Sequence, residues 1–152
     1  MSDTDKPAFR RAVVALSGSP SDARITRLVI DQATRLKAEV VAVHVVEIDW
    51  TLPLDADIAG RSEDAQRVLD MAEGIAESHK WHMEPVLLQA RDVGAAIVDE
   101  ATERGADLLV VGLPYRKRFG GEFAIGRTIP YILQNAPCTV WVVREPMSEG
   151  PS

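Results

Sequence analysis

Short, nearly uninterrupted apolar runs recur along the chain, and they constrain the fold more than any other feature. They lie at residues 12–16, 40–46, 84–89, 108–111 and 140–143. A strand made of consecutive apolar residues has to be buried on both of its faces, which is typical of parallel sheets. The longer segments between the runs carry apolar residues at helical spacing. This alternation predicts a single α/β domain in which helices cover both faces of a parallel sheet.

The segments between the apolar runs predict about four helices, at residues 25–36, 65–76, 94–101 and 129–136. Side chains that accept hydrogen bonds from free backbone N–H groups stand where these helices should begin. Ser21 or Asp22 is expected to cap the first helix. Asp92 and Thr128 are expected to cap the third and the fourth. Gly105 should end the third helix, because glycine tolerates the left-handed conformation common at helix ends.

The length and the charge of the chain exclude several classes of protein. At 152 residues it is most simply one domain, expected at residues 10–145, with a flexible leader at 1–9 and a flexible tail at 146–152. The formal net charge of −6 argues against a nucleic-acid partner, which needs a basic surface. The apolar runs are far shorter than the roughly 20 residues of a membrane span. The single Cys138 fits a reducing compartment. We therefore expect a cytoplasmic protein without membrane insertion.

The stretch between the fourth and fifth runs carries residues from which an anion site can be built. The fourth run ends at Gly112, and a short helix is expected to open at Gly126, Arg127 and Thr128. Between these points lie an aromatic residue and adjacent cations: Tyr115, Arg116, Lys117 and Arg118. Glycine lets the backbone approach a ligand, and a helix N-terminus offers free N–H groups to an anion. This order of strand, glycine-rich loop and helix start predicts a nucleotide- or phosphate-binding module.

The turn after the first run is expected to lie beside this loop. Ligands of open parallel sheets bind beyond the carboxyl ends of the strands, where the strand order switches. Residues 17–20, with Ser17 first, and the loop that starts at Gly112 should meet there. Two questions stay open. The adjacent cations either contact phosphates or form a solvated loop. Arg127 either pairs with a phosphate or blocks the pocket. His44 interrupts the second run, and we expect a hydrogen-bonded core or rim histidine in preference to a catalytic base.

Three segments of the chain match a known pattern. They are AVVALSGSP at the first run, VVAVHVVE at the second, and the stretch that contains ADLLVVG, GRT and LQNAPCTVWVVR. These segments resemble the universal stress protein family, which has an adenine-nucleotide alpha-hydrolase-like α/β fold. The resemblance covers about residues 10–145. It implies a doubly wound, five-stranded parallel sheet of order 3-2-1-4-5 with about four helices.

The resemblance also implies a ligand and the residues that hold it. The nucleotide-binding branch of the family holds an adenine nucleotide, ATP or AMP, and Mg²⁺ can accompany ATP. Carried over to this chain, the binding residues are Ser17, Val45, Gly112, Tyr115, Arg116, Lys117, Arg118, Gly126, Arg127 and Thr128.

The chain departs from the family motif at several of these positions. Tyr115 stands where the motif has its second glycine, and Arg127 stands where it has serine or threonine. Ser17 occupies the place of an aspartate that usually contacts the adenosine part. The spacing to Gly126 is one residue longer than in the motif. A tyrosine can stack on a base. If the position requires a positive φ, the change from glycine to tyrosine also costs backbone freedom.

Two functional hypotheses follow from these observations. In the first, the protein is a regulatory module that binds the nucleotide with little or no catalysis, so no catalytic residue and no metal ligand is assigned. In the second, the departures close the pocket, and the protein is a docking partner of a transporter or a signalling protein. Both include a homodimer, which the family forms through the last strand, here between Thr139 and Val143. Trp141 in that strand either packs under a helix or projects into the partner subunit.

Overall fold

Strands and helices alternate strictly along the chain in the computed structural model. The structure describes residues 6–56, 61–113 and 126–147. The strands are β1 (Arg11–Leu16), β2 (Glu39–Glu47), β3 (Glu84–Ala90), β4 (Leu108–Leu113) and β5 (Thr139–Arg144). The helices are α1 (Ser21–Leu36), α2 (Arg61–Ser78), α3 (Val93–Glu103) and α4 (Thr128–Asn135). Each apolar run of the sequence thus forms a strand, and each amphipathic segment forms a helix.

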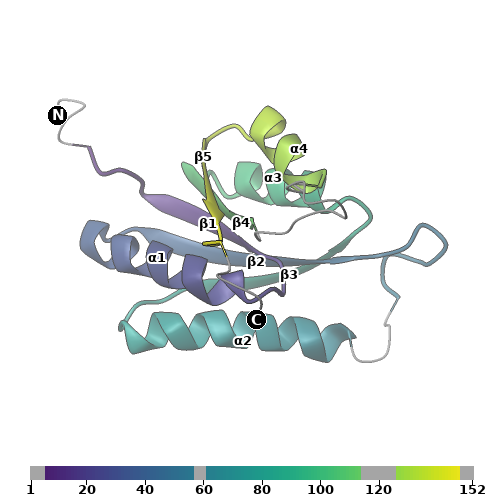
Figure 1. The fold of residues 1–152 in the computed structure, drawn as a ribbon, viewed down its shortest axis with the longest axis horizontal. Helices are drawn as coiled ribbons and strands as arrows, with labels where there is room; N and C mark the ends of the chain where they lie inside the picture. Colours follow the sequence, from purple (N-terminus) through teal and green to yellow (C-terminus); the bar gives the residue numbers. More distant parts are fainter. Residues whose placement is uncertain (1–5, 57–60, 114–125, 148–152) are drawn as a thin grey trace.

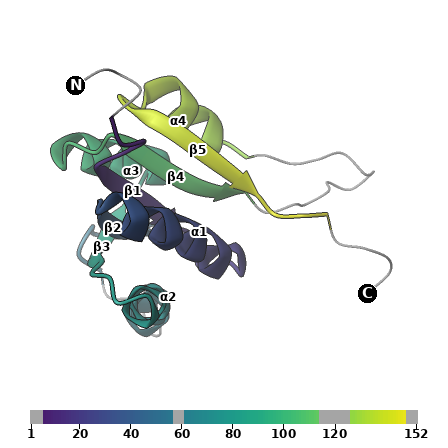
Figure 2. The same ribbon diagram turned by 90° about the vertical axis from the view of Figure 1, so that its left-hand side faces the viewer.

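The strands form one parallel sheet of order β3-β2-β1-β4-β5. Helices α1 and α2 cover one face of the sheet, and α3 and α4 cover the other, as Figure 1 and Figure 2 show. This confirms the predicted doubly wound sheet of order 3-2-1-4-5. The order switches between β1 and β4, which pair at Ala15 and Val111. The chain therefore leaves these neighbouring strands toward opposite faces, which opens a crevice at their carboxyl ends.

Two hydrophobic layers, one on each face of the sheet, hold the domain together. Neighbouring residues of β1 alternate between them. Val14 belongs to the layer that contains Ile25 and Val29 of α1. Val13 belongs to the layer that contains Ile97 of α3. Because the inner part of β1 has no exposed face, only apolar residues fit there, which explains the uninterrupted run in the sequence.

Two aromatic rings fasten the last strand to the start of the domain. Phe9, which is 1% exposed, meets Trp141 of β5 edge to face, with the ring centroids 5.8 Å apart. Both rings join the hydrophobic layer on the α1 face. Trp141 is partly buried against this layer, and its projection into a partner subunit stays a prediction. The sequence predicts Phe9 to lie in the flexible leader, whereas the packed domain includes it and so begins before the predicted boundary at residue 10.

The N-termini of α1 and α4 differ from the prediction. Pro20 holds the N-cap position of α1 without a side-chain hydrogen bond, so Ser21 and Asp22 lie in the first turn. Thr128 likewise lies in the first turn of α4, and Arg127 precedes it at the N-cap. The predicted capping roles of Ser21 or Asp22 and of Thr128 are therefore wrong. In α1 the reason is that the Asp22 carboxylate binds N–H groups of the preceding turn instead of those of the helix.

The ends of α3 agree with the prediction. Asp92 accepts a hydrogen bond from the N–H group of Ala95 at 3.1 Å, which caps the helix. Gly105 follows the helix with a φ of +64°, a backbone conformation that favours glycine. Within the described ranges, no helix is both long and apolar enough to cross a membrane.

Two helix glycines differ in the room around them, which predicts opposite effects of alanine. A Cβ on Gly74 of α2 would meet no atom within 4 Å, whereas one on Gly94 of α3 would approach Tyr131 Cδ1 at 3.1 Å. Gly74→Ala should stabilise the protein by about 0.5–1 kcal/mol, because alanine costs less backbone entropy on folding. Gly94→Ala should destabilise it by about 1 kcal/mol, because it forces Tyr131 of α4 to shift. Urea unfolding of both variants measures the difference, and equal stabilisation would contradict the close approach of α3 and α4.

Candidate functional site

The carboxyl ends of β1, β2 and β4 open into a cavity of about 380 Å³ beside helices α3 and α4, here called the strand-end cavity. Four of the predicted site residues line it: Ser17, Val45, Gly112 and Thr128. They come from three strand ends and from the first turn of α4, so the fold brings distant parts of the sequence together. Ligands of open α/β sheets bind at this place, where the strand order switches.

Most of the wall of the strand-end cavity is apolar, and the sequence pattern does not reveal these residues as part of a site. They include Ala15, Val93, Ile97, Leu113, Ile129 and Ile132. All of them belong to, or pack against, the hydrophobic layer that joins the sheet to α3 and α4. Their spacing in the sequence is therefore that of ordinary core residues. An apolar cavity with a few polar groups at its mouth is typical of sites for small organic molecules.

Of the remaining predicted residues, the structure describes Gly126 and Arg127, and neither of them lines the strand-end cavity. Gly126 has a φ of +78° and no atom within 4 Å of its Cβ position, so the backbone conformation and not crowding favours glycine there. Arg127 lines a neighbouring cavity of about 160 Å³, here called the rim cavity, which shares Glu47, Val93 and Thr128 with the first. Tyr115, Arg116, Lys117 and Arg118 lie outside the described residues.

The Arg127 side chain does not fill the strand-end cavity. It is 91% exposed, and its Nη2 lies 3.4 Å from Oε1 of Glu47 at the end of β2. An ion pair of this length between exposed groups contributes little to stability. The guanidinium is thus held only weakly at the rim, where it can form a charge-assisted hydrogen bond to an anion.

Gly112 allows α1 to pack closely on β4, a role that the sequence does not predict. A Cβ at this position would lie 3.2 Å from Ser21 Oγ and 3.4 Å from Ile25 Cδ1. Both atoms belong to the first half of α1, which covers the opposite face of the sheet from α3 and α4. Gly112 therefore makes room for α1 on one side while its backbone borders the strand-end cavity.

A buried carboxylate fixes the turn between β1 and α1. Asp22 is 2% exposed, and its oxygens accept hydrogen bonds from the N–H groups of Ser17 at 2.9 Å and Gly18 at 2.8 Å. Gly18 has a φ of +84°, in the region that favours glycine. The Ser17 hydroxyl donates a hydrogen bond to Ser19 Oγ at 2.9 Å. Ser17 is therefore held at the cavity through both its backbone and its side chain.

Burial raises the pKa of Asp22 above its ordinary value. Removal of a carboxylate from water disfavours its charged form, and here this effect outweighs the N–H groups of Ser17 and Gly18, which favour that form. The charge of His44 also opposes the rise, to a smaller extent. The sequence gives no sign of this role, because an acidic residue that caps a helix and one that folds back on the preceding turn have the same pattern.

His44 lies on the opposite face of the sheet from the strand-end cavity. Its neighbours Val43 and Val45 belong to the layer under α3 and α4, so the alternation of a strand directs His44 toward α1 and α2. The Nδ1–H group of His44 donates to the carbonyl oxygen of Leu16 at 2.9 Å. Of the two predicted environments, core or rim, the half-buried and hydrogen-bonded His44 has the one at the rim.

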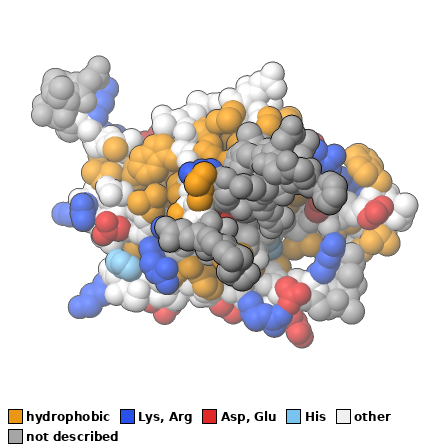
Figure 3. Space-filling model, viewed as in Figure 1, with side chains coloured by type: hydrophobic (Ala, Val, Ile, Leu, Met, Phe, Trp, Pro, Cys, Tyr) orange, Lys and Arg blue, Asp and Glu red, His pale blue; other side chains and the backbone are white. Residues whose placement is uncertain are grey.

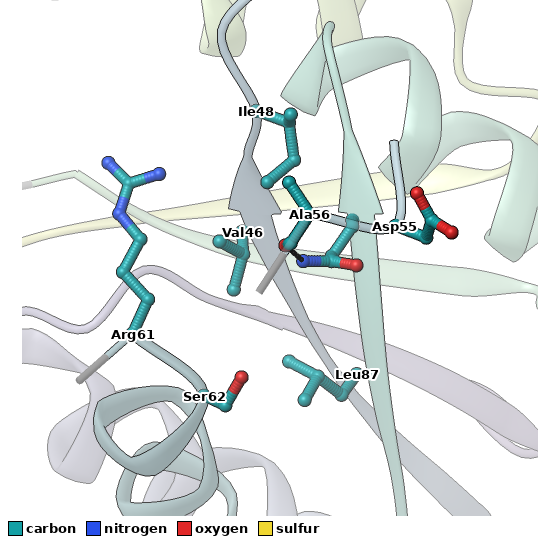
Figure 4. A pocket seen from close by; sticks show the side chains of 8 residues that line it. Val46, Ile48, Asp55, Ala56, Arg61, Ser62 and Leu87 are labelled. Atoms are coloured by element: carbon teal, nitrogen blue, oxygen red, sulfur yellow. Dashed lines mark hydrogen bonds between the residues drawn. The ribbon is translucent and has the colours of Figure 1, made fainter. Parts of the chain in front are cut away.

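Other hollows of the surface show that size alone does not identify the site. A groove of about 680 Å³ on the α1–α2 face is lined by Ser17 and Glu47, which also line the strand-end cavity. A hollow of about 230 Å³ lies between the ends of β2 and β3 and the start of α2, as Figure 4 shows. In it, Gln89 Nε2 donates to the Ala56 carbonyl oxygen at 3.0 Å. None of the predicted site residues that the structure describes lines this smaller hollow.

Known proteins resemble this chain over most of its length. The model of the universal stress protein family matches residues 8–144. A universal stress protein of Methanocaldococcus jannaschii is 24% identical over 147 residues, which cover 93% of this chain and 85% of that protein. The sensor protein KdpD of Mycobacterium tuberculosis is 28% identical over 145 residues, which cover 95% of this chain but only 16% of KdpD.

Solved structures share the fold. A universal stress protein from Archaeoglobus fulgidus superposes with a TM-score of 0.73 at 23% identity, covering 89% of this chain and 98% of that one. The universal stress protein from Archaeoglobus fulgidus in complex with dAMP gives 0.69 at 19% identity, covering 91% and 99%. A universal stress protein family protein from Arabidopsis thaliana with AMP bound gives 0.64 at 16% identity, covering 94% and 96%.

The buried carboxylate of Asp22 predicts how stability depends on pH. Because its pKa is raised in the folded state, the folded protein holds this proton more tightly than the unfolded chain does. This stabilisation is fully present below the ordinary aspartate pKa of about 3.9, and it is lost as the pH rises through the folded pKa. The free energy of unfolding of the wild type, relative to that of Asp22→Asn, should therefore fall as the pH rises from the ordinary aspartate pKa through the raised pKa of the folded state.

Urea unfolding at a series of pH values measures this difference for Asp22. Asp99→Asn removes an exposed carboxylate of α3 and serves as the matched control for the loss of one carboxylate. A relative stability of the wild type that rises with pH would show that the N–H groups of Ser17 and Gly18 outweigh the effect of burial.

Proposed function

The chain belongs to the universal stress protein family, and on this premise we propose that it binds an adenine nucleotide in the strand-end cavity. The observation that carries the proposal is the convergence of three strand ends and of Thr128 on one apolar cavity. Relatives of the same fold hold dAMP and AMP, which supports this class of ligand. The volume of about 380 Å³ falls within the range of about 300–1,000 Å³ typical of small-molecule sites.

The chemistry of the cavity indicates how a nucleotide would lie. The apolar side chains of Val45, Ile97 and Ile129 offer a surface on which adenine can be removed from water. Thr128 opens α4, and the free N–H groups and the dipole of a helix start favour a phosphate. The Arg127 guanidinium stands beside this turn and can add a charge-assisted hydrogen bond. The base would thus lie toward the sheet and α3, with the phosphate toward α4 and the solvent.

The proposed ligands are AMP and ATP, with Mg²⁺ accompanying ATP. AMP needs one phosphate site, and the start of α4 together with Arg127 can supply it. The longer phosphate chain of ATP would extend out of the strand-end cavity, and Mg²⁺ would bridge its phosphates. Tyr115, Arg116, Lys117 and Arg118 stay predicted contacts of these phosphates.

We propose that the site serves binding and not turnover. His44 lies on the other face of the sheet, and its Nδ1–H group is bonded to the Leu16 carbonyl oxygen. The Ser17 hydroxyl donates to Ser19. These two side chains are therefore not arranged as a nucleophile and its base within the cavity. The bound nucleotide would act as a signal that orders the turns around it, while a role in the stress response and a location in the cytoplasm stay predictions.

A docking function, with a second copy of the chain as partner, is favoured by the edge of the sheet at β5. An edge strand offers unpaired backbone groups to another strand. Val142 of β5 is 37% exposed, Leu133 of α4 is 58% exposed and Met147 is 61% exposed. Figure 3 shows hydrophobic side chains gathered over the part of the surface where β5 lies. We propose a homodimer through β5, and the match to KdpD is consistent with a signalling context.

Adenine nucleotides should stabilise the protein against unfolding. A ligand that binds only the folded state, at ten times its Kd, raises the free energy of unfolding by about 1.4 kcal/mol. We expect AMP, or ATP with Mg²⁺, to cause this shift in urea unfolding. Mass spectrometry of freshly purified, denatured protein should also detect a released adenine nucleotide. A protein that carries no nucleotide and does not respond to added AMP or ATP would overturn the proposal.

Matched threonine variants test the orientation of the ligand in the same measurement. In the proposed orientation the Thr128 hydroxyl also donates to the phosphate. Thr128→Val keeps the branched shape but removes the hydroxyl, and a lost hydrogen bond to a charged group costs about 1.5–3 kcal/mol. The affinity for AMP should fall roughly tenfold or more, while that for adenosine stays unchanged. Thr102→Val, on an exposed position of α3, should change neither affinity. An equal loss for AMP and adenosine would contradict the contact of Thr128 with the phosphate.

Val142→Lys should convert the proposed dimer into a monomer. A lysine at this position would place a charge from each subunit in an apolar interface, and edge strands that carry lysine resist pairing. Light scattering after size-exclusion chromatography measures the mass. Leu28→Lys is the matched control on α1, because Leu28 is 40% exposed and Val142 is 37% exposed. A dimer that persists in Val142→Lys, or a wild type that is monomeric at every concentration, would contradict the proposed interface.

A further inference from the structure

Glu47, the last residue of β2, is the one ionisable side chain among the described residues that line the strand-end cavity. It also lines the rim cavity, together with Arg127 and Thr128. A glutamate at a strand end has the sequence pattern of a solvated surface residue, so the sequence does not predict it as a site residue. An ionised carboxylate offers only hydrogen-bond acceptors. At the mouth of a cavity, it therefore selects a ligand group that donates hydrogen bonds.

The backbone of Glu47 is fixed, so the side chain starts from a defined point at the mouth. Glu47 pairs with Ala90 of β3 in the parallel ladder. Its carbonyl oxygen accepts a hydrogen bond from Arg61 Nη1 at 2.8 Å. In the described part of the chain, the partner of its carboxylate is Arg127, at 3.4 Å. A carboxylate has about four acceptor positions, and among the described residues Arg127 occupies one of them.

The contact with Arg127 indicates which part of a nucleotide lies beside Glu47. In the proposed orientation the phosphate meets Arg127 and the start of α4, while the base lies deeper, against residues such as Ile97. The ribose joins these two parts of the ligand. Because the Glu47 carboxylate lies next to the guanidinium that meets the phosphate, the ribose is the part that comes within its reach.

We propose that Glu47 binds the 2′ and 3′ hydroxyls of the ribose and so makes the site selective for nucleotides with a free vicinal diol. This inference rests on the proposed binding of an adenine nucleotide. Two neighbouring hydroxyls are donors at a spacing that matches the two oxygens of one carboxylate, and hydrogen bonds to an ionised acceptor are the strong ones. Ser17, at the end of the neighbouring strand, does not offer the same charged acceptor, because its side chain is uncharged and its hydroxyl donates to Ser19.

The same carboxylate disfavours nucleotides whose 3′ oxygen carries a phosphate. Such ligands lose one donor and bring a negative charge toward Glu47, and like charges at short distance repel. The site should therefore prefer AMP over 3′,5′-cyclic AMP as well as over 2′,3′-dideoxy-AMP.

The test compares the affinities of AMP and 2′,3′-dideoxy-AMP by calorimetry in the full chain. The wild type should bind AMP at least about tenfold more tightly than the dideoxy nucleotide, which lacks both donors. In Glu47→Ala the affinities for the two nucleotides should differ by no more than about twofold, because the carboxylate acceptor is gone. Glu47→Gln should give an intermediate ratio, since an amide has a single oxygen acceptor. Glu77→Gln makes the same charge change on an exposed position of α2 and should keep the wild-type ratio.

The ratio of the two affinities separates the role of Glu47 from a general effect on the fold or on Arg127, because such an effect weakens both ligands alike. Equal binding of the two nucleotides by the wild type, or a preference that persists in Glu47→Ala, would overturn the inference and leave adenine-nucleotide binding intact. Failure of both nucleotides to bind the folded wild type would overturn the proposed function itself, and this inference with it.

Discussion

Burial of both faces of the central strands is the constraint on which the rest of the structure depends. β1 has β2 and β4 as its neighbours in the sheet and a hydrophobic layer on each face. Burial of a side chain such as Val13 or Val14 contributes about 1.5–3 kcal/mol, and unpaired polar groups are excluded from these layers. Glycine and polar residues gather where the strands leave the layers. The constraint that builds the core therefore also concentrates the chemistry at the carboxyl ends of the strands.

Periodicity carries most of the information that the fold needs. The apolar runs predict β2 and β4 to within two residues of their ends, at 40–46 against Glu39–Glu47 and at 108–111 against Leu108–Leu113. The helix starts are harder to predict because they depend on which backbone N–H groups a single side chain binds. Asp22 has the sequence pattern of a cap, but burial beside the turn after β1 gives its carboxylate other partners. Such a choice is made by tertiary packing, which the local sequence does not contain.

The candidate site divides in the same way into positions that the sequence predicts and positions that it does not. Ser17, Gly112 and Thr128 stand beside strand or helix ends, and the topology alone brings such positions together. Ile97 borders the cavity as a core residue at the edge of its layer, so its spacing indicates only a helix face. Glu47 is recognised as a site residue by its contact with Arg127, which lies 80 residues further along the chain. No pattern of local spacing predicts a contact across that separation.

Phe9 and Trp141 come from the two ends of the domain, yet their rings pack against each other in one hydrophobic layer. The ribosome makes β1 first, whereas its neighbour β4 and the aromatic partner of Phe9 appear late in synthesis. The α1 side of the core therefore stays open until the last strand has left the ribosome. Until β4 has been made, one edge of β1 has no partner and can pair with foreign strands. The order of synthesis thus leaves the α1 side of the core incomplete until the segment that contains Trp141 is present.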